Sequence, residues 1–431
     1  MKKVEKIKRV KGELRVPSDK SITHRAFILG SLASGETRVI NPLISEDTKA
    51  TLDILKMLGT ETEEREKEVL IKGRNYLFKE PENVLDAKNS GTTARIMLGV
   101  LSTQPFFSVL TGDESLRNRP MLRVVEPLRE MGASIDGREE GNRLPVSVRG
   151  GKLRGISFFN KRSSAQVKSS LLLAGLRAEG ITEVVEPYLS RDHTERMLKL
   201  FGAEIITVPE ERGHIVKVKG GQELKGTEIY CPADPSSAAY FAALATLAPE
   251  GEILLKDVLL NPTRDGFYRK LKEMGGNFEV INYRELSNEP IGDLLVKPSE
   301  SLKGIKVTPD DVPSLIDEIP ILAVLMAFAE GVSEVRGAKE LRYKESDRIK
   351  AVVNNLRKMG VKVEELEDGF IIEGSKNVRG ARIETHGDHR IAMAFAIAGL
   401  VIEDELVIDH PECVAVSYPQ FWEHILEVAE F

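Results

Sequence analysis

One unit of roughly 70–80 residues recurs six times along the sequence, which predicts a modular fold. Each copy opens with an apolar helical segment that follows small or polar residues, as capped helix starts do. The starts are Ser18-Asp19-Lys20, Asn89-Ser90-Gly91-Thr92, Ser163-Ser164-Ala165-Gln166, Asp234-Pro235-Ser236-Ser237, Ser314-Leu315-Ile316-Asp317 and Gly387-Asp388-His389-Arg390. After a strand, a second helix ends in five copies with a basic last turn and Gly, as in residues 55–59, a C-cap signal. Two strand-like segments close the unit.

The repeat predicts a mixed α/β protein with two domains. At 431 residues the chain is longer than one compact core usually is. The sixth copy stops after its second helix, and residues 4–16 resemble the strands that it lacks. We therefore expect an inserted domain, residues 17–231, with copies one to three. A discontinuous domain, residues 1–16 plus 232–431, would hold copies four to six.

Composition narrows the class of partner and the cellular setting. A net charge of −6 gives no support to a nucleic-acid partner, which favours a basic face. No signal peptide is recognisable, and the longest apolar runs, 319–329 and 391–402, are too short to cross a bilayer. Cys231 and Cys413 could pair in principle but indicate no disulfide framework. We expect a cytoplasmic monomer with no nucleic-acid or membrane partner.

The first helix start predicts an anion site. Ser18 or Asp19 is expected to cap the helix. The first turn then presents Lys20, Ser21 and Arg25 at the positive end of the helix dipole. A capped surface helix with solvated charges is the alternative for this stretch taken alone.

Three other segments offer comparable chemistry. Gly91 leaves backbone room for a ligand at a helix N-terminus, with a packing glycine as the alternative. Arg119 lies in an Arg-rich loop and could clamp a phosphate or carboxylate, unless the loop is merely solvated. Lys344 and Arg348 are spaced i, i+4 and are expected on one helical face. Glu345 between them could stay ionised or exchange protons, with a solvated helix start as the alternative.

Asp317 and a histidine pair leave other possibilities open. Asp317 stands at the head of a very apolar helix, where a carboxylate is either an N-cap or a buried base. His386 and His389 are three residues apart, but zinc needs a further ligand, so no metal is expected. The sequence contains no Walker A motif, nucleophile elbow or dinucleotide fingerprint.

Taken in order, these segments resemble the 5-enolpyruvylshikimate-3-phosphate (EPSP) synthase family. The resemblance spans nearly the whole chain and is carried by Lys20-Ser21…Arg25, Asn89-Ser90-Gly91-Thr92…Arg95, Arg119-Pro120, Ser164-Ala165-Gln166, Asp317, Lys344-Glu345-Ser346-Asp347-Arg348 and Asp388-His389-Arg390. It implies two domains, each of three βαβαββ units with helices inside and sheets outside, an inside-out α/β barrel. The implied activity is transfer of the enolpyruvyl group of phosphoenolpyruvate to the 5-hydroxyl of shikimate 3-phosphate. Phosphate is released, by addition and elimination, in a step of the shikimate pathway.

The resemblance also implies roles for individual residues. The residues implied to bind phosphoenolpyruvate are Lys20, Gly91, Arg119, Gln166, Arg348 and Arg390. Those implied to bind shikimate 3-phosphate are Lys20, Ser21, Arg25, Ser164, Gln166, Arg191, Asp317 and Lys344. Asp317 would be the base for the hydroxyl and Glu345 the acid, with Lys20 also able to carry a proton or charge. No cofactor or metal is expected, because phosphoenolpyruvate brings its own leaving group. Since the cations belong to both domains, closure over the substrates is expected.

Three motifs resemble the glyphosate-tolerant second class of the family, and two positions depart from family patterns. The motifs are Ser164-Ala165-Gln166-Val167-Lys168, Arg191-Asp192-His193-Thr194-Glu195 and Asn261-Pro262-Thr263-Arg264. Val416 stands where many members carry a lysine, so one phosphoenolpyruvate cation is missing or supplied elsewhere. Gly91 stands where some tolerant members carry an alanine whose methyl group crowds glyphosate.

Three other functions are alternatives to enolpyruvyl transfer to shikimate 3-phosphate. The enolpyruvyl transferase that acts on UDP-N-acetylglucosamine usually carries a reactive cysteine in the loop that here holds Arg119, and this loop has none. RNA 3′-phosphate cyclase shares the repeat unit, but no basic groove is evident. A non-catalytic scaffold that binds anionic partners would leave Asp317 and Glu345 without a role.

Overall fold

The computed structural model describes residues 1–211 and 213–431, which divide into two compact units. Unit 1 comprises Met1–Pro17 and Pro232–Phe431, and unit 2 comprises Ser18–Cys231. Unit 2 is therefore inserted between two parts of unit 1 in the sequence. Whether each unit is a domain that folds alone stays a prediction.

Unit 2 contains three four-stranded sheets with one strand order. The sheets are β14-β3-β5-β4, β6-β7-β9-β8 and β10-β11-β13-β12. In each sheet the first two strands are parallel and the other neighbours are antiparallel. Their bounds are β3 Glu36–Ile40, β4 Glu61–Glu64, β5 Glu68–Lys72, β6 Leu85–Asp86, β7 Phe107–Thr111, β8 Ser134–Gly137, β9 Arg143–Arg149, β10 Ser157–Phe159, β11 Ile181–Glu186, β12 Ile205–Pro209, β13 His214–Lys219 and β14 Glu228–Tyr230.

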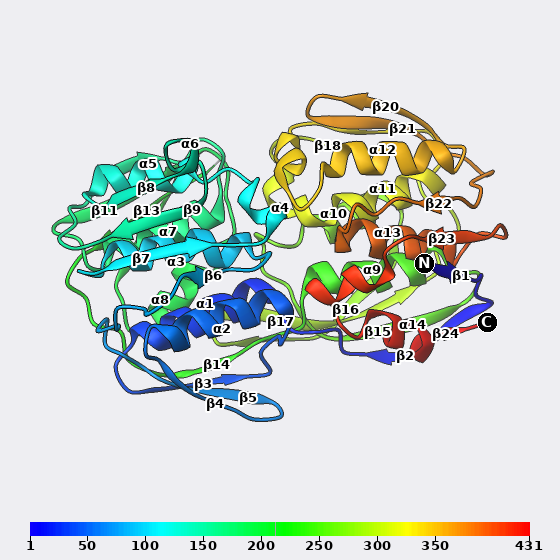
Figure 1. Ribbon diagram of the computed structural model, residues 1–431. Helices are drawn as coiled ribbons and strands as arrows, with labels where there is room; N and C mark the ends of the chain where they lie inside the picture. The colour runs from blue at the N-terminus through cyan, green and yellow to red at the C-terminus, as the bar shows by residue number, and fades with distance from the viewer. Residues whose placement is uncertain (212) are drawn as a thin grey trace. The chain divides into compact units, whose positions relative to one another are not determined.

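Unit 1 contains related sheets of four, five and three strands among its described residues, and the N-terminal strands β1 and β2 join two of them. Its sheets are β18-β19-β21-β20, β16-β17-β15-β2-β24 and β1-β23-β22. The bounds are β1 Lys2–Val4, β2 Arg9–Leu14, β15 Gly251–Leu259, β16 Asn277–Leu286, β17 Glu289–Lys297, β18 Lys306–Val307, β19 Val332–Val335, β20 Lys362–Leu366, β21 Gly369–Glu373, β22 Arg382–Ile383, β23 Leu406–Ile408 and β24 Ala429–Glu430. Strand β1 supplies the missing strand of the sixth copy, beside β23 (Figure 1). We had expected all of residues 4–16 to do so, but β2 opens the fourth copy by pairing in parallel with β15.

The first helix of each copy is buried on nearly every side. These inner helices are α1 Lys20–Leu32, α3 Gly91–Ser102, α7 Ala165–Gly175, α9 Pro235–Leu247, α11 Ile319–Phe328 and α13 His389–Gly399. Beyond their first two turns, their residues are small or apolar all round, so no face there favours solvent. A side chain at Gly99 would place its Cβ 2.2 Å from the Ser170 carbonyl oxygen, so α3 and α7 approach closely through glycine. Helices therefore lie inside and sheets outside, which confirms the expected α/β architecture.

The second helices are amphipathic and cover the inner ones. They are α2 Glu46–Met57, α5 Leu122–Met131, α8 His193–Leu200, α10 Gly266–Met274, α12 Arg348–Lys358 and α14 Phe421–Val428. Two end directly on a left-handed glycine, Gly132 at φ 115° and Gly275 at φ 100°. Short turns complete the fold: α4 Glu114–Arg117, α6 Arg138–Gly141, and the 3-10 turns η1 Val312–Ser314, η2 Ile316–Glu318, η3 Lys339–Tyr343 and η4 Pro411–Val416. Within residues 1–211 and 213–431, every helix falls short of the length and apolar character that a membrane crossing requires.

Candidate active site

The start of α1 fixes a lysine beside a buried acid. The Asp19 carboxylate accepts a hydrogen bond from the Ile22 amide at 2.8 Å, so Asp19 is the cap rather than Ser18. Lys20 opens the helix, and its Nζ lies 2.8 Å from Asp47 Oδ2. Asp47 is buried in the first turn of α2 and holds the ammonium group at the helix N-terminus.

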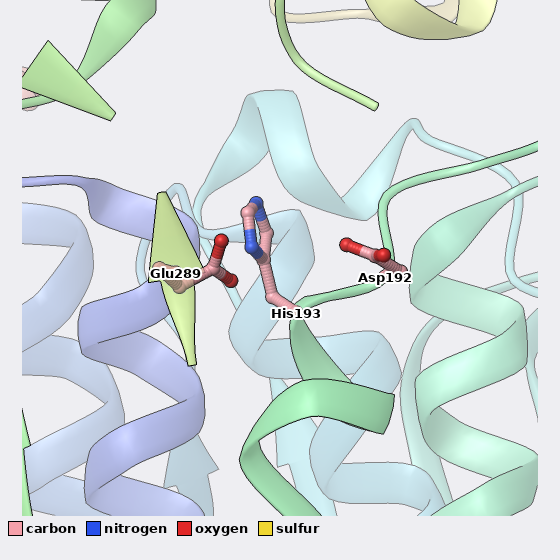
Figure 2. Close-up of side chains that lie close together, drawn as sticks. All are labelled: Asp192, His193 and Glu289. Atoms are coloured by element: carbon pink, nitrogen blue, oxygen red, sulfur yellow. The ribbon is translucent and has the colours of Figure 1, made fainter. Parts of the chain in front are cut away.

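A second group joins α1 to α7 and α8. Arg25 is buried and donates from Nε to Thr194 Oγ1 at 2.8 Å and from Nη2 to Ser169 Oγ at 3.0 Å. Arg191, which precedes α8, donates from Nη1 to Ser21 Oγ at 3.0 Å. The structure therefore brings together three of the residues that the sequence predicted for one substrate. Figure 2 shows the neighbouring Asp192 and His193 where α8 begins.

The start of α3 gathers two guanidinium groups around a glycine. A Cβ on Gly91 would lie 2.8 Å from Arg95 Nη1 and 3.2 Å from Arg119 Nη1. Both arginines are buried, and Arg119 donates from Nη2 to the Asn89 carbonyl oxygen. Arg95 Nη1 donates to Gln166 Oε1 at 2.8 Å, which ties the start of α7 to the same place. Two cations at the N-terminus of a helix form an arrangement suited to a phosphate or carboxylate.

Two predicted details of unit 2 can be placed. Ser164 caps α7, since its Oγ accepts from the Val167 amide at 3.4 Å. The Arg-rich loop that was expected to be irregular contains the helical turn α4, capped by Asp113, because Asp113 Oδ1 accepts from the Leu116 amide at 2.8 Å.

Arg348 is the centre of a buried charge cluster in unit 1. Its Nε lies 2.9 Å from Asp388 Oδ2, and its Nη2 lies 2.8 Å from Glu345 Oε2. Asp317 Oδ1 lies 3.5 Å from Arg348 Nη1 and 3.7 Å from Lys344 Nζ. One fully buried cation thus faces three carboxylates, which favour the charged form of the guanidinium group.

The pKa values of this cluster follow from burial and neighbouring charge. Burial lowers the pKa of Lys344, and the Asp317 carboxylate offsets only part of that change. Burial alone would also lower the pKa of Arg348, but Asp388, Glu345 and Asp317 outweigh it and raise that pKa. Lys344 is therefore the cation here that gives up a proton more readily than an ordinary lysine.

The structure rules out one of the two alternatives for Asp317 and corrects the expectation for Lys344. Asp317 lies in the 3-10 turn η2, and Glu318 is the residue that precedes α11, so Asp317 is not its N-cap. Lys344 does not share a helical face with Arg348, because α12 begins at Arg348 itself and is capped by Asp347. The two cations approach Asp317 because the chain folds back on itself, not because of helical spacing.

The last inner helix carries Arg390 in its first turn. Asp388 caps α13 by accepting from the Arg390 amide at 2.9 Å. Arg390 is buried, and its Nη1 lies 3.5 Å from the Tyr240 hydroxyl oxygen. Burial raises the pKa of Tyr240 to about 12, so the tyrosine stays neutral beside the cation. His386 and His389 belong to no group of three metal-ligating side chains in the described part of the chain.

Several contributing residues were not predicted. Asp47, Ser169 and Thr194 each bind one of the predicted cations, but only the folded chain shows this. Asp47 stands in an ordinary acidic first turn next to a capping box, and such acids are common without any ligand. No local signal in the sequence distinguishes it.

Known proteins resemble the chain over its whole length. A family model described as EPSP synthase (3-phosphoshikimate 1-carboxyvinyltransferase) matches residues 4–425. The 3-phosphoshikimate 1-carboxyvinyltransferase of Aquifex aeolicus is 79% identical over 431 residues, 100% of both chains. That of Persephonella marina is 56% identical over 425 residues, 98% of both chains.

Solved structures agree with these relatives. An EPSP synthase from Acinetobacter baumannii is similar with a TM-score of 0.86 and 43% identity, covering 99% of this chain and 97% of that one. The enolpyruvyl transferase NikO from Streptomyces tendae has a TM-score of 0.77 at 15% identity, covering 99% and 96%, and so shares the fold. The chain belongs to the EPSP synthase family.

Proposed function

We propose that this protein is a 3-phosphoshikimate 1-carboxyvinyltransferase. It transfers the enolpyruvyl group of phosphoenolpyruvate to the 5-hydroxyl of shikimate 3-phosphate and releases phosphate. The observation that carries this proposal is the 79% identity, over the entire chain, to a relative of that name. The helix starts and buried cations described above are what two phosphorylated acids require.

We assign phosphoenolpyruvate to cations and helix starts in both units. Gly91, Arg119 and Gln166 would contact it from unit 2. Because Gly91 has no side chain, the ligand can approach the backbone at the start of α3. The full set proposed for this substrate is Lys20, Gly91, Arg119, Gln166, Arg348 and Arg390. Guanidinium groups suit it because they bind phosphate and carboxylate in a bidentate way.

We assign shikimate 3-phosphate to a set centred on the start of α1. The set is Lys20, Ser21, Arg25, Ser164, Gln166, Arg191, Asp317 and Lys344. The hydrogen bond between Arg191 and Ser21 supports a common phosphate site for these two residues. Residues of both units are assigned to each substrate, so we also propose that binding brings the units closer. Small-angle scattering that shows no compaction with shikimate 3-phosphate would contradict this.

The reaction needs two opposite proton transfers. Addition removes the proton of the 5-hydroxyl, joins its oxygen to C2 of phosphoenolpyruvate and adds a proton to the methylene carbon. Elimination then removes a proton from the resulting methyl group and breaks the C–O bond to phosphate, which leaves. We propose Asp317 as the base and Glu345 as the acid, with Lys20 able to carry a proton or charge. The contacts of Asp317 with Lys344 and Arg348 support this, because two cations stabilise the ionised form that a base requires.

A turnover assay tests the function and the base together. Phosphate release from phosphoenolpyruvate should depend on shikimate 3-phosphate. Asp317→Ala should still bind shikimate 3-phosphate through the other assigned residues but lose most turnover, about 10²-fold or more. Asp310→Ala, which removes an exposed carboxylate from the same segment, is the matched control and should leave turnover unchanged. Phosphate release without shikimate 3-phosphate would reject the function, and full activity of Asp317→Ala would reject the base. UDP-N-acetylglucosamine in place of shikimate 3-phosphate should give no release.

We also propose the glyphosate-tolerant second class for this enzyme. The motifs that end in Lys168, Glu195 and Arg264 support this subtype, whereas Gly91 lacks the methyl group that crowds glyphosate in some tolerant members. A glyphosate inhibition constant like that of sensitive enzymes would reject the subtype. We propose further that the enzyme acts as a cytoplasmic monomer, which sedimentation equilibrium tests through the mass in solution.

A further inference from the structure

Two of the motifs noted in the sequence end in residues that meet in a buried ionic cluster. Lys168 lies on α7, and its side chain is fully buried. Its Nζ is 2.8 Å from Glu186 Oε1, at the end of β11, and 3.1 Å from Glu195 Oε2, in the first turns of α8. We call Lys168, Glu186 and Glu195 the lysine cluster. Three charged side chains without access to water are expensive to bury, so their retention calls for a role beyond stability.

The two acids of the lysine cluster differ in their surroundings. Glu186 also accepts hydrogen bonds from the Ser190 amide at 3.2 Å and from the Ser190 hydroxyl at 2.7 Å, as suits an ionised carboxylate. Glu195 Oε1 is buried without a hydrogen-bond partner among the described residues. Burial raises the pKa of Glu195 more than the Lys168 ammonium lowers it. Glu186 therefore has the larger set of hydrogen-bond donors of the two acids.

The lysine cluster lies behind residues already assigned to the substrate. Glu186 accepts a hydrogen bond from the Ser190 hydroxyl. The next residue is Arg191, which donates to Ser21. One residue before Glu195 on α8 stands Thr194, the partner of Arg25. The cluster thus fixes both ends of the segment 187–194 against α7.

We propose that the lysine cluster is a positioning device that holds Arg191 and Arg25 in the geometry that binds the phosphate of shikimate 3-phosphate. This inference rests on the proposed function. It gives a physical reason why the Ser-Ala-Gln-Val-Lys and Arg-Asp-His-Thr-Glu motifs occur in one chain: the last residue of one binds the last residue of the other.

Lys168→Met tests the proposal, because methionine keeps the length of the side chain and removes its charge. We expect the KM for shikimate 3-phosphate to rise about tenfold while the KM for phosphoenolpyruvate changes less than about twofold. Lys199→Met removes an exposed lysine from α8 and should leave both constants unchanged. Glu195→Gln keeps the size of the side chain and an acceptor for Lys168, so it should raise the KM for shikimate 3-phosphate less than Lys168→Met does. Unchanged shikimate 3-phosphate KM in Lys168→Met, or an equal rise for both substrates, would overturn the proposal.

A double variant distinguishes a positioning role of Lys168 from a general loss of structure. If Lys168 acts through Arg191, adding Lys168→Met to an Arg191→Ala enzyme should weaken shikimate 3-phosphate binding by less than about twofold, because coupled effects are not additive. Independent, additive losses would overturn the proposal. Should Lys168→Met alone not fold, the charge-neutral pair Lys168→Met with Glu186→Gln takes its place, judged by the same KM ratio.

A substrate-free measurement keeps this inference distinct from the proposed function. Amide hydrogen exchange in residues 187–194 should become faster in Lys168→Met, while exchange in α3 stays at the wild-type rate. Unchanged exchange in 187–194 overturns the positioning role whatever the enzyme's substrate is. Failure of the wild-type enzyme to bind shikimate 3-phosphate would reject the proposed function instead.

Discussion

His24 should make the stability of unit 2 sensitive to mild acid. His24 lies on α1, is fully buried, and its Nδ1 is 2.8 Å from Thr51 Oγ1. Thr51 Oγ1 is 2.6 Å from Thr93 Oγ1, and the Thr93 hydroxyl donates to Ser90 Oγ at 2.7 Å. A hydroxyl has one proton, so Thr51 donates to Thr93 and must accept from His24. The neutral His24 ring therefore carries its proton on Nδ1.

The size of the effect follows from proton linkage. Burial lowers the pKa of His24 well below its ordinary value of 6.5, and Lys20 and Arg25 lower it further. Below that ordinary value the unfolded chain binds a proton at this position and the folded chain does not. The free energy of unfolding therefore falls with decreasing pH, by up to about 1.4 kcal/mol per pH unit and by up to about 2.3 kcal/mol between pH 6.5 and 4.5.

His24→Asn is the variant that tests this effect, because the asparagine side-chain amide can donate to Thr51 but does not titrate. The variant loses part of a ring, which should cost about 1–2 kcal/mol at every pH. Its loss on moving from neutral pH to about pH 4.5 should be smaller than that of the wild type by up to about 2.5 kcal/mol. Guanidinium denaturation followed by circular dichroism measures both losses, and nitrogen NMR should show a neutral His24 ring at pH 5. Equal pH dependence in the two proteins, or a protonated ring at pH 5, would refute the reasoning.

Three further outcomes follow from the site. Gly91→Ala places a methyl group within 2.8 Å of Arg95 Nη1 and 3.2 Å of Arg119 Nη1, so steady-state kinetics should show a KM for phosphoenolpyruvate raised about fivefold; an unchanged value would contradict the crowding. Arg348→Met leaves the Asp388 carboxylate buried without its cation, and denaturation should register a loss of about 3–5 kcal/mol, whereas a loss below about 1 kcal/mol would not fit. Burial raises the pKa of Asp388, but Arg348 outweighs it and holds that pKa below its ordinary value, so the carboxylate stabilises the fold above about pH 4. That stability is lost as pH falls through the folded pKa, and the difference between wild type and Asp388→Asn should shrink below about pH 4; a constant difference would argue against it.

Local signals predicted the fold well because they depend on neighbouring residues. Asp19, Ser90 and Ser164 each cap the helix that their sequence context predicted. The six-fold repeat likewise predicted a modular α/β fold, and the family resemblance implied that the helices lie inside and the sheets outside. Family resemblance then supplied the implied activity, which no periodicity contains.

Contacts between distant segments could not be read in the same way. The approach of Lys344 to Asp317 depends on two turns that precede helices, and helical spacing gave a wrong geometry there. The pairing of Lys20 with Asp47 joins residues 27 positions apart, and that of Lys168 with Glu186 joins residues 18 apart. The residues within one helical turn of Lys20 or Lys168 do not indicate which acid pairs with that lysine.

Strands β1 and β2 are synthesised first but pair with strands that are synthesised much later. Strand β1 needs β23 beside it, and β2 needs both β15 and β24, where Arg9 pairs with Glu430. All of residues 18–231 leave the ribosome before these partners exist. The first two strands therefore have exposed, unpaired edges while more than half of the protein is synthesised. A chaperone that shields residues 2–14 during translation would act where the nascent chain is most vulnerable to wrong pairing.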